Sequence, residues 1–202
     1  HVLNNLVFSY IKEQSDEASR YMAKHLGEPD WCEGYGVRNT HTRAVAPTKS
    51  TALIMGGVSE GINPDPAMVY TQLTAAGEVD RTNPVLLKLM KEKGVYNKRN
   101  IKQVTAAKGS VQGVSWLTDH EKKVFKTAFE INQKIILRQG SLRQTKLDQG
   151  QSLNLFFLSD MDEGYISEVH KEAFEDKNIN ALYYCYSSRA VSASEGECES
   201  CQ

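Results

Sequence analysis

The sequence predicts an α/β protein, and three consecutive segments near its C-terminus carry that prediction. Residues 153–158 form an apolar run of strand length, residues 162–176 place apolar side chains at helical spacing, and residues 181–186 resemble a second strand. A strand, a helix and a strand at this spacing indicate a parallel α/β unit, because the helix carries the chain back to the start of the sheet. The residues expected on the buried face of that helix are Ile166, Val169, Ala173 and Phe174.

Composition narrows the class of protein further. The 202 residues are 40% hydrophobic and carry 24 basic against 25 acidic side chains, which is typical of one globular domain. No apolar run approaches the roughly 18 residues of a membrane span, so we expect no membrane partner. A net charge of -1 provides no basic surface for nucleic acid, which is therefore not an expected partner either.

The N-terminal quarter predicts a helix followed by a strand. Residues 2–25 keep apolar side chains at helical spacing and stop at Gly27. Residues 38–46 form a short run that favours a strand, closed by Pro47 and by a polar turn at residues 48–51.

Glycine and proline dominate the next part of the chain. Residues 56–83 are predicted to be mostly loop, in which Glu60 and Asn63 could line a ligand site, although polar loop residues usually face water. Residues 84–93 predict a helix, because Asn83 is a suitable N-cap and proline fits the first helical position.

A capping box predicts one further helix. Thr118 is followed three residues later by Glu121, and the apolar period continues from there to a stop at Gly140. At the other end of the chain, residues 188–202 are too polar to bury a core face, which predicts a mobile tail.

A hydroxyl-rich turn is the first candidate binding site. Pro47, Thr48, Lys49, Ser50 and Thr51 offer three hydroxyls, one ammonium and backbone N–H groups at the end of the predicted strand, where α/β proteins bind phosphate groups. The turn lacks the glycines of a Walker loop, so it does not indicate a kinase or a nucleotide hydrolase. The structural alternative is a polar turn in which Thr48 caps the next segment.

Two adjacent tyrosines and four cysteines are the other candidates. Tyr183 and Tyr184 would pass an electron if both rings lay on one route, but regular strand alternation places neighbouring rings on opposite faces.

Cys198 and Cys201 form a terminal CxxC that permits reversible dithiol exchange, or they are an incidental pair. The concentration of cysteines at the terminus, rather than through the chain as staples, indicates a reducing compartment, the cytoplasm. The other two cysteines, expected to be small buried hydrophobes, are Cys32 and Cys185.

Several motifs in a fixed order resemble one family. They are residues 46–51, residues 56–62, residues 120–128, residues 149–154 (Gln-Gly-Gln-Ser-Leu-Asn), the Leu-Tyr-Tyr of residues 182–184 and the terminal CxxC. Together they resemble the C-terminal part of a class I ribonucleotide reductase large subunit. The resemblance implies that residues 1–187 form the C-terminal portion of the family's ten-stranded α/β barrel and that residues 188–202 form a flexible, redox-active tail.

The resemblance also implies roles for the candidate residues. Residues 48–51 would bind the diphosphate of a ribonucleoside diphosphate, with Lys49 at a position that the family varies. Tyr183 and Tyr184 would carry a radical from a metal-containing small subunit. Cys198 and Cys201 would reduce the active-site disulfide and then be reduced by thioredoxin or glutaredoxin.

Other parts of the family's machinery precede the matched region. The cysteine that becomes a thiyl radical, its asparagine and glutamate neighbours, the reducing cysteine pair and the sites for nucleotide effectors have no counterpart here. The resemblance therefore implies that this chain holds no metal or cofactor and acts with the N-terminal part of a large subunit in deoxyribonucleotide biosynthesis for DNA replication. It would be either a split-gene subunit, as in some phages, or a fragment.

Two other functions remain open on the residues alone. The chain would be a non-catalytic module that binds a phosphate ligand or carries electrons through its dithiol, or the terminal cysteines would bind zinc. Dithiol exchange without any partner favours the carrier, whereas nucleotide reduction that requires partners favours the reductase.

Overall fold

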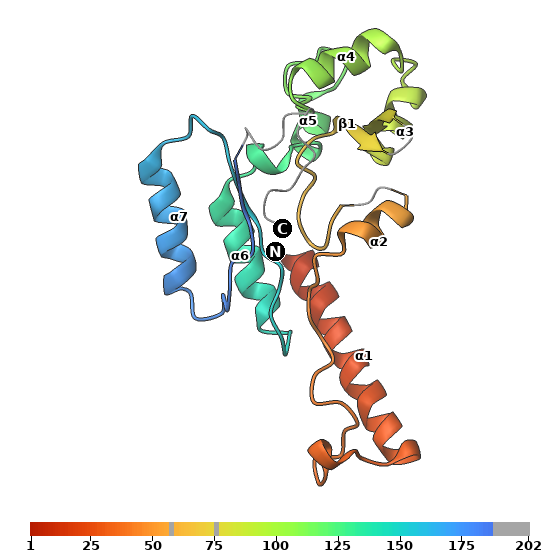
Figure 1. Cartoon of the computed structure of the whole chain (residues 1–202), viewed down its shortest axis with the longest axis vertical. Helices are drawn as coiled ribbons and strands as arrows, with labels where there is room; N and C mark the ends of the chain where they lie inside the picture. The colour runs from red at the N-terminus through yellow and green to blue at the C-terminus, as the bar shows by residue number, and fades with distance from the viewer. Residues whose placement is uncertain (57–58, 75–76, 188–202) are drawn as a thin grey trace. The chain divides into compact units, whose positions relative to one another are not determined.

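The computed structural model describes residues 1–56, 59–74 and 77–187 (Figure 1). These residues form two compact units that alternate along the sequence. The first unit comprises residues 1–46, 133–153 and 167–183, and the second comprises residues 47–132, 154–166 and the chain from 184. No helix in the described part of the chain is both long and apolar enough to cross a membrane. The division expected at residue 187 stays a prediction, because residues 188–202 lie outside the described part.

Helices build the first unit. Helix α1 (Val2–Leu26) packs against α6 (Gln133–Gln144), and Nδ2 of Asn4 donates to the carbonyl of Gln139 at 3.2 Å. The predicted N-terminal helix is therefore confirmed, and it ends before Gly27 as expected. A short 3-10 turn, η1 (Asp30–Cys32), follows it.

A buried guanidinium lies between α1 and α6. Arg143 donates through Nε to Oε1 of Gln151 at 3.2 Å, and its guanidinium lies 5.8 Å from the centre of the Phe8 ring. Burial lowers the pKa of Arg143 to about 10. The group stays charged at neutral pH, because that pKa is still well above 7.

The strand predicted for residues 38–46 is reduced to a single bridge. Val45 pairs in parallel with Gln151, its N–H donates to the carbonyl of Gly150 at 3.2 Å, and its carbonyl accepts from Ser152 at 2.8 Å. Two more backbone bonds hold the segment, because the N–H of Gln149 donates to the carbonyl of Arg43 at 3.1 Å and the N–H of Arg38 donates to the carbonyl of Ser19 at 3.2 Å. Side chains supply its other contacts, so the backbone pairing stays too short to count as a strand.

The second unit combines short helices with two strand pairs. Its first half contains α2 (Lys49–Ile54), β1 (Val69–Thr74), β2 (Gly77–Thr82), α3 (Pro84–Glu92) and α4 (Lys98–Ala106). Its second half contains α5 (Asp119–Val124), η2 (Ala128–Glu130), β3 (Leu155–Phe157), the start of α7 (Glu163–Glu175) and β4 (Cys185–Ser187). The largest group of buried apolar side chains is Met68, Val69, Leu86, Met90, Val104, Val111, Val114, Leu117 and Phe125.

The prediction of loop for residues 56–83 is wrong in its second half. Strands β1 and β2 pair antiparallel there, with Val69 opposite Thr82. The run Val-Tyr-Thr at residues 69–71 has the β-branched and aromatic composition of a strand, but the glycines and prolines before it concealed the signal. Helix α3 is confirmed, and Oδ1 of Asn83 accepts from the N–H of Leu86 at 3.1 Å. Helix α4 was not predicted.

The single helix predicted from Thr118 to Gly140 is wrong, because the chain forms three elements there. The capping box of Thr118 and Glu121 is confirmed, and a hydrogen bond from Lys93 at 2.6 Å, together with Thr118, lowers the pKa of Glu121 to about 2. A second capping box at Thr127 then begins η2, so the first helix cannot continue. Gly140 lies inside α6 instead of ending it.

The parallel strand pair near the C-terminus is confirmed, but β4 covers Cys185–Ser187 instead of the predicted residues 181–186, so Tyr183 and Tyr184 precede it. Leu155 pairs with Cys185 and Phe157 with Ser187, all in parallel register. On α7, Val169 and Ala173 are buried as predicted, but Phe174 is 78% exposed. Phe174 follows Ala173 directly, and one residue turns a helix by about 100°, which carries its ring off the buried face.

Glycine at position 109 has a sharp steric role. It adopts φ +82°, and a Cβ there would lie 2.3 Å from Cβ of Ala67. We expect Gly109→Ala to lower the free energy of unfolding by about 2–5 kcal/mol, because it adds overpacking to left-handed backbone strain. Gly94, at φ +66° with open space around it, is the control, and Gly94→Ala should cost only about 1–2 kcal/mol. Urea denaturation of both variants checks this; equal losses would contradict the steric argument.

Candidate functional site

The hydroxyl-rich turn begins the short helix α2. Thr48 has a positive φ of 52°, and its carbonyl accepts from the N–H of Ala52 at 2.8 Å, which starts the helix. Its hydroxyl accepts from the N–H of Gly61 at 2.8 Å. A hydroxyl that accepts one bond still has its own proton to donate. Ser50 and Thr51 are exposed on α2, and the side chain of Lys49 lies outside the described part.

Asn63 links this loop to the second strand pair. The expectation that polar loop residues face water is wrong for Asn63, because it is buried. Its N–H and its side-chain amide both donate to the carbonyl of Glu60, at 3.1 and 3.3 Å. Its Oδ1 accepts from the backbone N–H of Asn154 at 3.2 Å. The Asn63 side chain therefore satisfies a backbone carbonyl in one segment and a backbone N–H in another that is far away in the sequence.

Asn154 continues the connection to residues 183–187, which comprise Tyr183, Tyr184 and β4 and are called the tyrosine strand below. It is buried, and its Oδ1 accepts from the backbone N–H of Tyr184 at 3.1 Å. The carbonyl of Tyr184 in turn accepts from the N–H of Leu155 at 2.9 Å. A chain of hydrogen bonds thus connects the segment of Gly61 through two buried asparagines to Tyr184.

The tyrosine rings follow strand alternation. Tyr184 is partly buried, and its ring centre lies 5.6 Å from that of Tyr186. Tyr183 is 50% exposed, and its N–H donates to the carbonyl of Leu153 at 2.9 Å. The sequence placed Asn154 in a family motif but gave it no role, and it gave none to Tyr186 either. The spacing of two between Tyr184 and Tyr186 is the signal that would have indicated the second.

The cysteines divide between buried and exposed positions. Cys32 is buried as predicted, but Cys185 is exposed, so the prediction of a buried thiol is wrong there. Partial burial still raises the pKa of Cys185, which keeps it a thiol at neutral pH. Cys198 and Cys201 lie outside the described residues. Among the residues that are described, no group of three or more His, Cys, Asp or Glu side chains gathers where a metal ion would bind.

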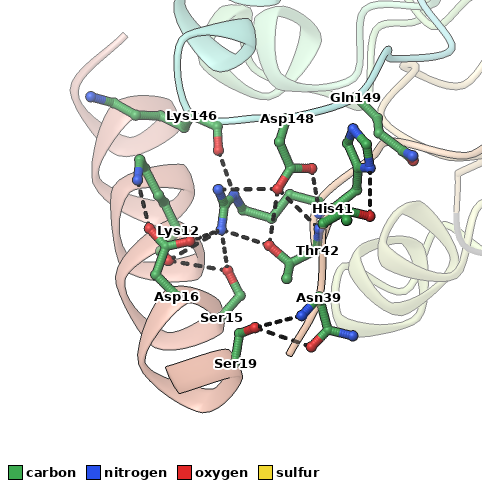
Figure 2. A network of polar contacts seen from close by, with 12 residues as sticks. Lys12, Ser15, Asp16, Ser19, Asn39, His41, Thr42, Lys146, Asp148 and Gln149 are labelled. Atoms are coloured by element: carbon green, nitrogen blue, oxygen red, sulfur yellow. Dashed lines mark hydrogen bonds and ion pairs between the residues drawn. The ribbon is translucent and has the colours of Figure 1, made fainter. Parts of the chain in front are cut away.

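A polar network in the first unit holds the segment that leads to the hydroxyl-rich turn (Figure 2). The side chain of Arg43 is only 8% exposed and forms ion pairs with Asp16 on α1 and with Asp148, the latter at 3.2 Å. It also donates to Ser15 Oγ at 2.7 Å and to the carbonyl of Lys146 at 2.9 Å. One guanidinium therefore ties the segment to both of its neighbours.

Asp148 also binds the backbone of that segment. Its carboxylate accepts from the N–H groups of Thr42 and Arg43, both at 2.9 Å. Partial burial by itself would raise the pKa of Asp148, but these N–H groups and the Arg43 guanidinium outweigh it and hold the pKa below its ordinary value. The pKa of Asp16 is likewise lowered, first by its hydrogen bond to Lys12 and then by Arg43.

Comparisons with known proteins agree on one family. The family described as "Ribonucleotide reductase, barrel domain" matches residues 4–185. A protein of Frog virus 3 named as a ribonucleoside-diphosphate reductase large subunit is 39% identical over 90% of this chain, and one of Invertebrate iridescent virus 6 is 34% identical over 95%. The solved structure of the Actinobacillus ureae class Id ribonucleotide reductase alpha subunit superposes with a TM-score of 0.82, at 36% identity, over 93% of this chain.

The chain is short compared with these proteins. It spans 32% of the Frog virus 3 protein, 20% of the Invertebrate iridescent virus 6 protein and 34% of the Actinobacillus ureae chain. The comparisons confirm the predicted α/β fold class and the identification of part of a reductase barrel.

Because the folded-state pKa of Asp148 is depressed, its ionised carboxylate stabilises the fold above its unfolded pKa, and that contribution is lost as pH falls through the folded pKa. We expect Asp148→Asn to lower the free energy of unfolding at pH 7 by about 1.5–3 kcal/mol, the range for hydrogen bonds to charged groups. The variant should also lose less stability than the native chain between about pH 6 and pH 3.

Urea denaturation at pH 7, pH 6 and pH 3 measures the free energy of unfolding of the native chain and the variant. Glu17 is an exposed acid on α1, so Glu17→Gln is the matched control. An unchanged pH dependence in Asp148→Asn would contradict the role given to this carboxylate.

Proposed function

The chain belongs to the ribonucleotide reductase barrel-domain family, and we propose that it works in the large subunit of a ribonucleoside-diphosphate reductase, which converts ribonucleoside diphosphates to deoxyribonucleoside diphosphates by radical chemistry. The observation that carries this proposal is the hydrogen-bonded connection between the hydroxyl-rich turn and the tyrosine strand through Asn63 and Asn154. A reductase needs substrate binding and radical delivery to be positioned together, and this connection supplies a rigid link between the two segments.

Substrate binding is assigned to the hydroxyl-rich turn. The hydroxyls of Thr48, Ser50 and Thr51, the backbone N–H groups of the turn and the ammonium of Lys49 would bind the diphosphate. Thr48 is supported most directly, since its hydroxyl accepts from Gly61 and has its proton to donate to a phosphate oxygen. Hydrogen bonds to an ionised phosphate are stronger than neutral ones, so a few suffice.

Radical delivery is assigned to Tyr183 and Tyr184. One of the two tyrosines would lose an electron and its phenolic proton to the phenoxyl radical of the other, and the active-site thiol would then give an electron and a proton to the relay. Each step breaks one O–H or S–H bond and forms one O–H bond, so the number of unpaired electrons is conserved. Asn154 supports the assignment by holding the backbone of Tyr184, because ring position controls the rate of such a transfer.

The remaining machinery would come from partners. Cys198 and Cys201 would reduce the active-site disulfide and pass oxidising equivalents to thioredoxin or glutaredoxin. A metal-containing small subunit would generate the radical, and the N-terminal part of a large subunit would supply the thiyl-radical cysteine and the effector sites. An apolar face of α1 supports such a partner, because its side chains are exposed in the described chain: Val2, Leu3, Leu6, Val7 and Tyr10.

We expect Tyr184→Phe to abolish reduction of a ribonucleoside diphosphate when this chain is combined with an N-terminal large-subunit part and a small subunit. Phenylalanine keeps the ring but removes the oxidisable hydroxyl. Tyr165→Phe is the matched control; Tyr165 lies in the same unit, 6.4 Å from the Phe157 ring, and its loss should leave activity in place. Deoxyribonucleotide formation measures both. Activity that persists in Tyr184→Phe would exclude the relay, and inactivity of every native mixture would favour the carrier function.

For the binding turn, we expect Ser50→Ala to raise KM for the ribonucleoside diphosphate about tenfold to a hundredfold with little change in kcat, because one hydrogen bond to a charged phosphate is lost. Ser50→Thr keeps the hydroxyl and should restore KM. Steady-state kinetics of the reconstituted enzyme measure both constants. A KM in Ser50→Ala equal to the native value would remove Ser50 from the binding site.

A further inference from the structure

A ladder of aromatic rings extends from Tyr184 through the second unit, to which all of its members belong. The Tyr186 ring lies 5.6 Å from that of Tyr184 and stacks on Phe156 at 5.1 Å and 22°. Phe156 in turn contacts Phe129 edge to face at 5.5 Å. Phe156 and Phe129 are buried in one apolar cluster against which Tyr186 packs. The two tyrosines are therefore in ring contact beside an apolar wall.

Strand geometry explains why these two rings meet. Tyr184 directly precedes β4, and residues two apart in extended chain point to the same side, so Tyr184 and Tyr186 share a side while Cys185 points to the other. Parallel pairing with β3 fixes Tyr186 opposite Phe156, which aligns the two rings for stacking. The hydrogen bond from Tyr184 to Asn154 fixes the backbone at the first ring. The contact thus depends on backbone constraints from both sides.

Ring contact of this kind has a chemical consequence for a relay tyrosine. Electron transfer slows steeply as donor and acceptor separate, and the Tyr184 and Tyr186 ring centres are only 5.6 Å apart. Both groups are tyrosines, so their O–H bonds differ in strength only through their surroundings. An oxidising equivalent on Tyr184 would therefore have a second phenol of similar energy beside it.

We propose that Tyr186 is a further redox-active tyrosine that exchanges a hydrogen atom with Tyr184; this rests on the proposed function, which supplies the radical. In the step, the Tyr184 phenoxyl takes an electron and a proton from Tyr186, so one O–H bond forms on Tyr184 and one breaks on Tyr186. No other oxidant or reductant is consumed. Tyr186 thereby holds the unpaired electron beside the relay and returns it by the reverse step.

The exposed thiol of Cys185 is the competing hydrogen donor on this strand. Its side chain points away from the ladder, and its raised pKa keeps the S–H bond intact at neutral pH. The direct exchange between the two phenols needs no thiol. Replacing the sulfur with oxygen in Cys185→Ser therefore separates the two routes.

The test places 3-aminotyrosine, which is oxidised more easily than tyrosine, at one position at a time in the reconstituted reductase with ribonucleoside diphosphate present. The three positions are 184, 186 and, as the matched control on α7, 165. Electron paramagnetic resonance detects the aminotyrosyl radical by its nitrogen hyperfine coupling. We expect a radical at 184 and at 186, none at 165, and the same signal at 186 in a Cys185→Ser background.

The outcomes separate this proposal from the one on which it rests. A radical at 184 without one at 186 overturns the exchange and leaves the relay in place. A radical at neither position overturns the relay, and the exchange with it. Loss of the signal at 186 in the Cys185→Ser background assigns the transfer to the thiol and overturns direct exchange. A signal of equal strength at 165 shows that the oxidation is unspecific, which also overturns direct exchange.

Discussion

Two buried asparagines join three segments of the second unit through their hydrogen bonds. A buried amide that lacks a partner costs about 1–3 kcal/mol, so Asn63 and Asn154 are stable in the interior only while both are hydrogen-bonded. The partners of their side-chain oxygens are backbone N–H groups, at Asn154 and at Tyr184. A displacement of either segment would therefore leave a buried amide and a buried N–H unpaired together.

In the first unit, ion pairs instead of amide hydrogen bonds connect segments that are far apart in sequence. Arg43 joins α1 to the segment of residues 146–148, and its two carboxylate partners remain about one quarter exposed. Charges in that position respond to pH and salt, whereas neutral buried amides do not. Acid should thus loosen the segment that precedes the hydroxyl-rich turn before it affects the asparagine connection.

Local signals explain which elements the sequence predicted. Helix α1, the caps at Asn83 and Thr118, and strand β3 each depend on nearby residues, and all are present. The prediction of a single helix from residue 118 to residue 140 is wrong because a second helix-start signal lies inside it. That signal is the capping box at Thr127, which interrupts a continuous apolar period. The burial of Asn63 was missed for another reason. Its partner Asn154 is 91 residues away, and no local sequence pattern reveals that contact.

The alternation of side chains along the tyrosine strand determines which rings can meet. Alternation assigns adjacent tyrosines to opposite faces, which is why the sequence alone did not favour a relay through Tyr183 and Tyr184. The same rule places Tyr186 on the face of Tyr184, where the two rings are in contact. A transfer through Tyr184 would therefore meet two neighbours of different kind, one half-exposed on the preceding residue and one stacked on an apolar cluster. Solvent reorganisation would be smaller beside the cluster, so the proposed unpaired electron on Tyr186 would be better protected from water than one on Tyr183.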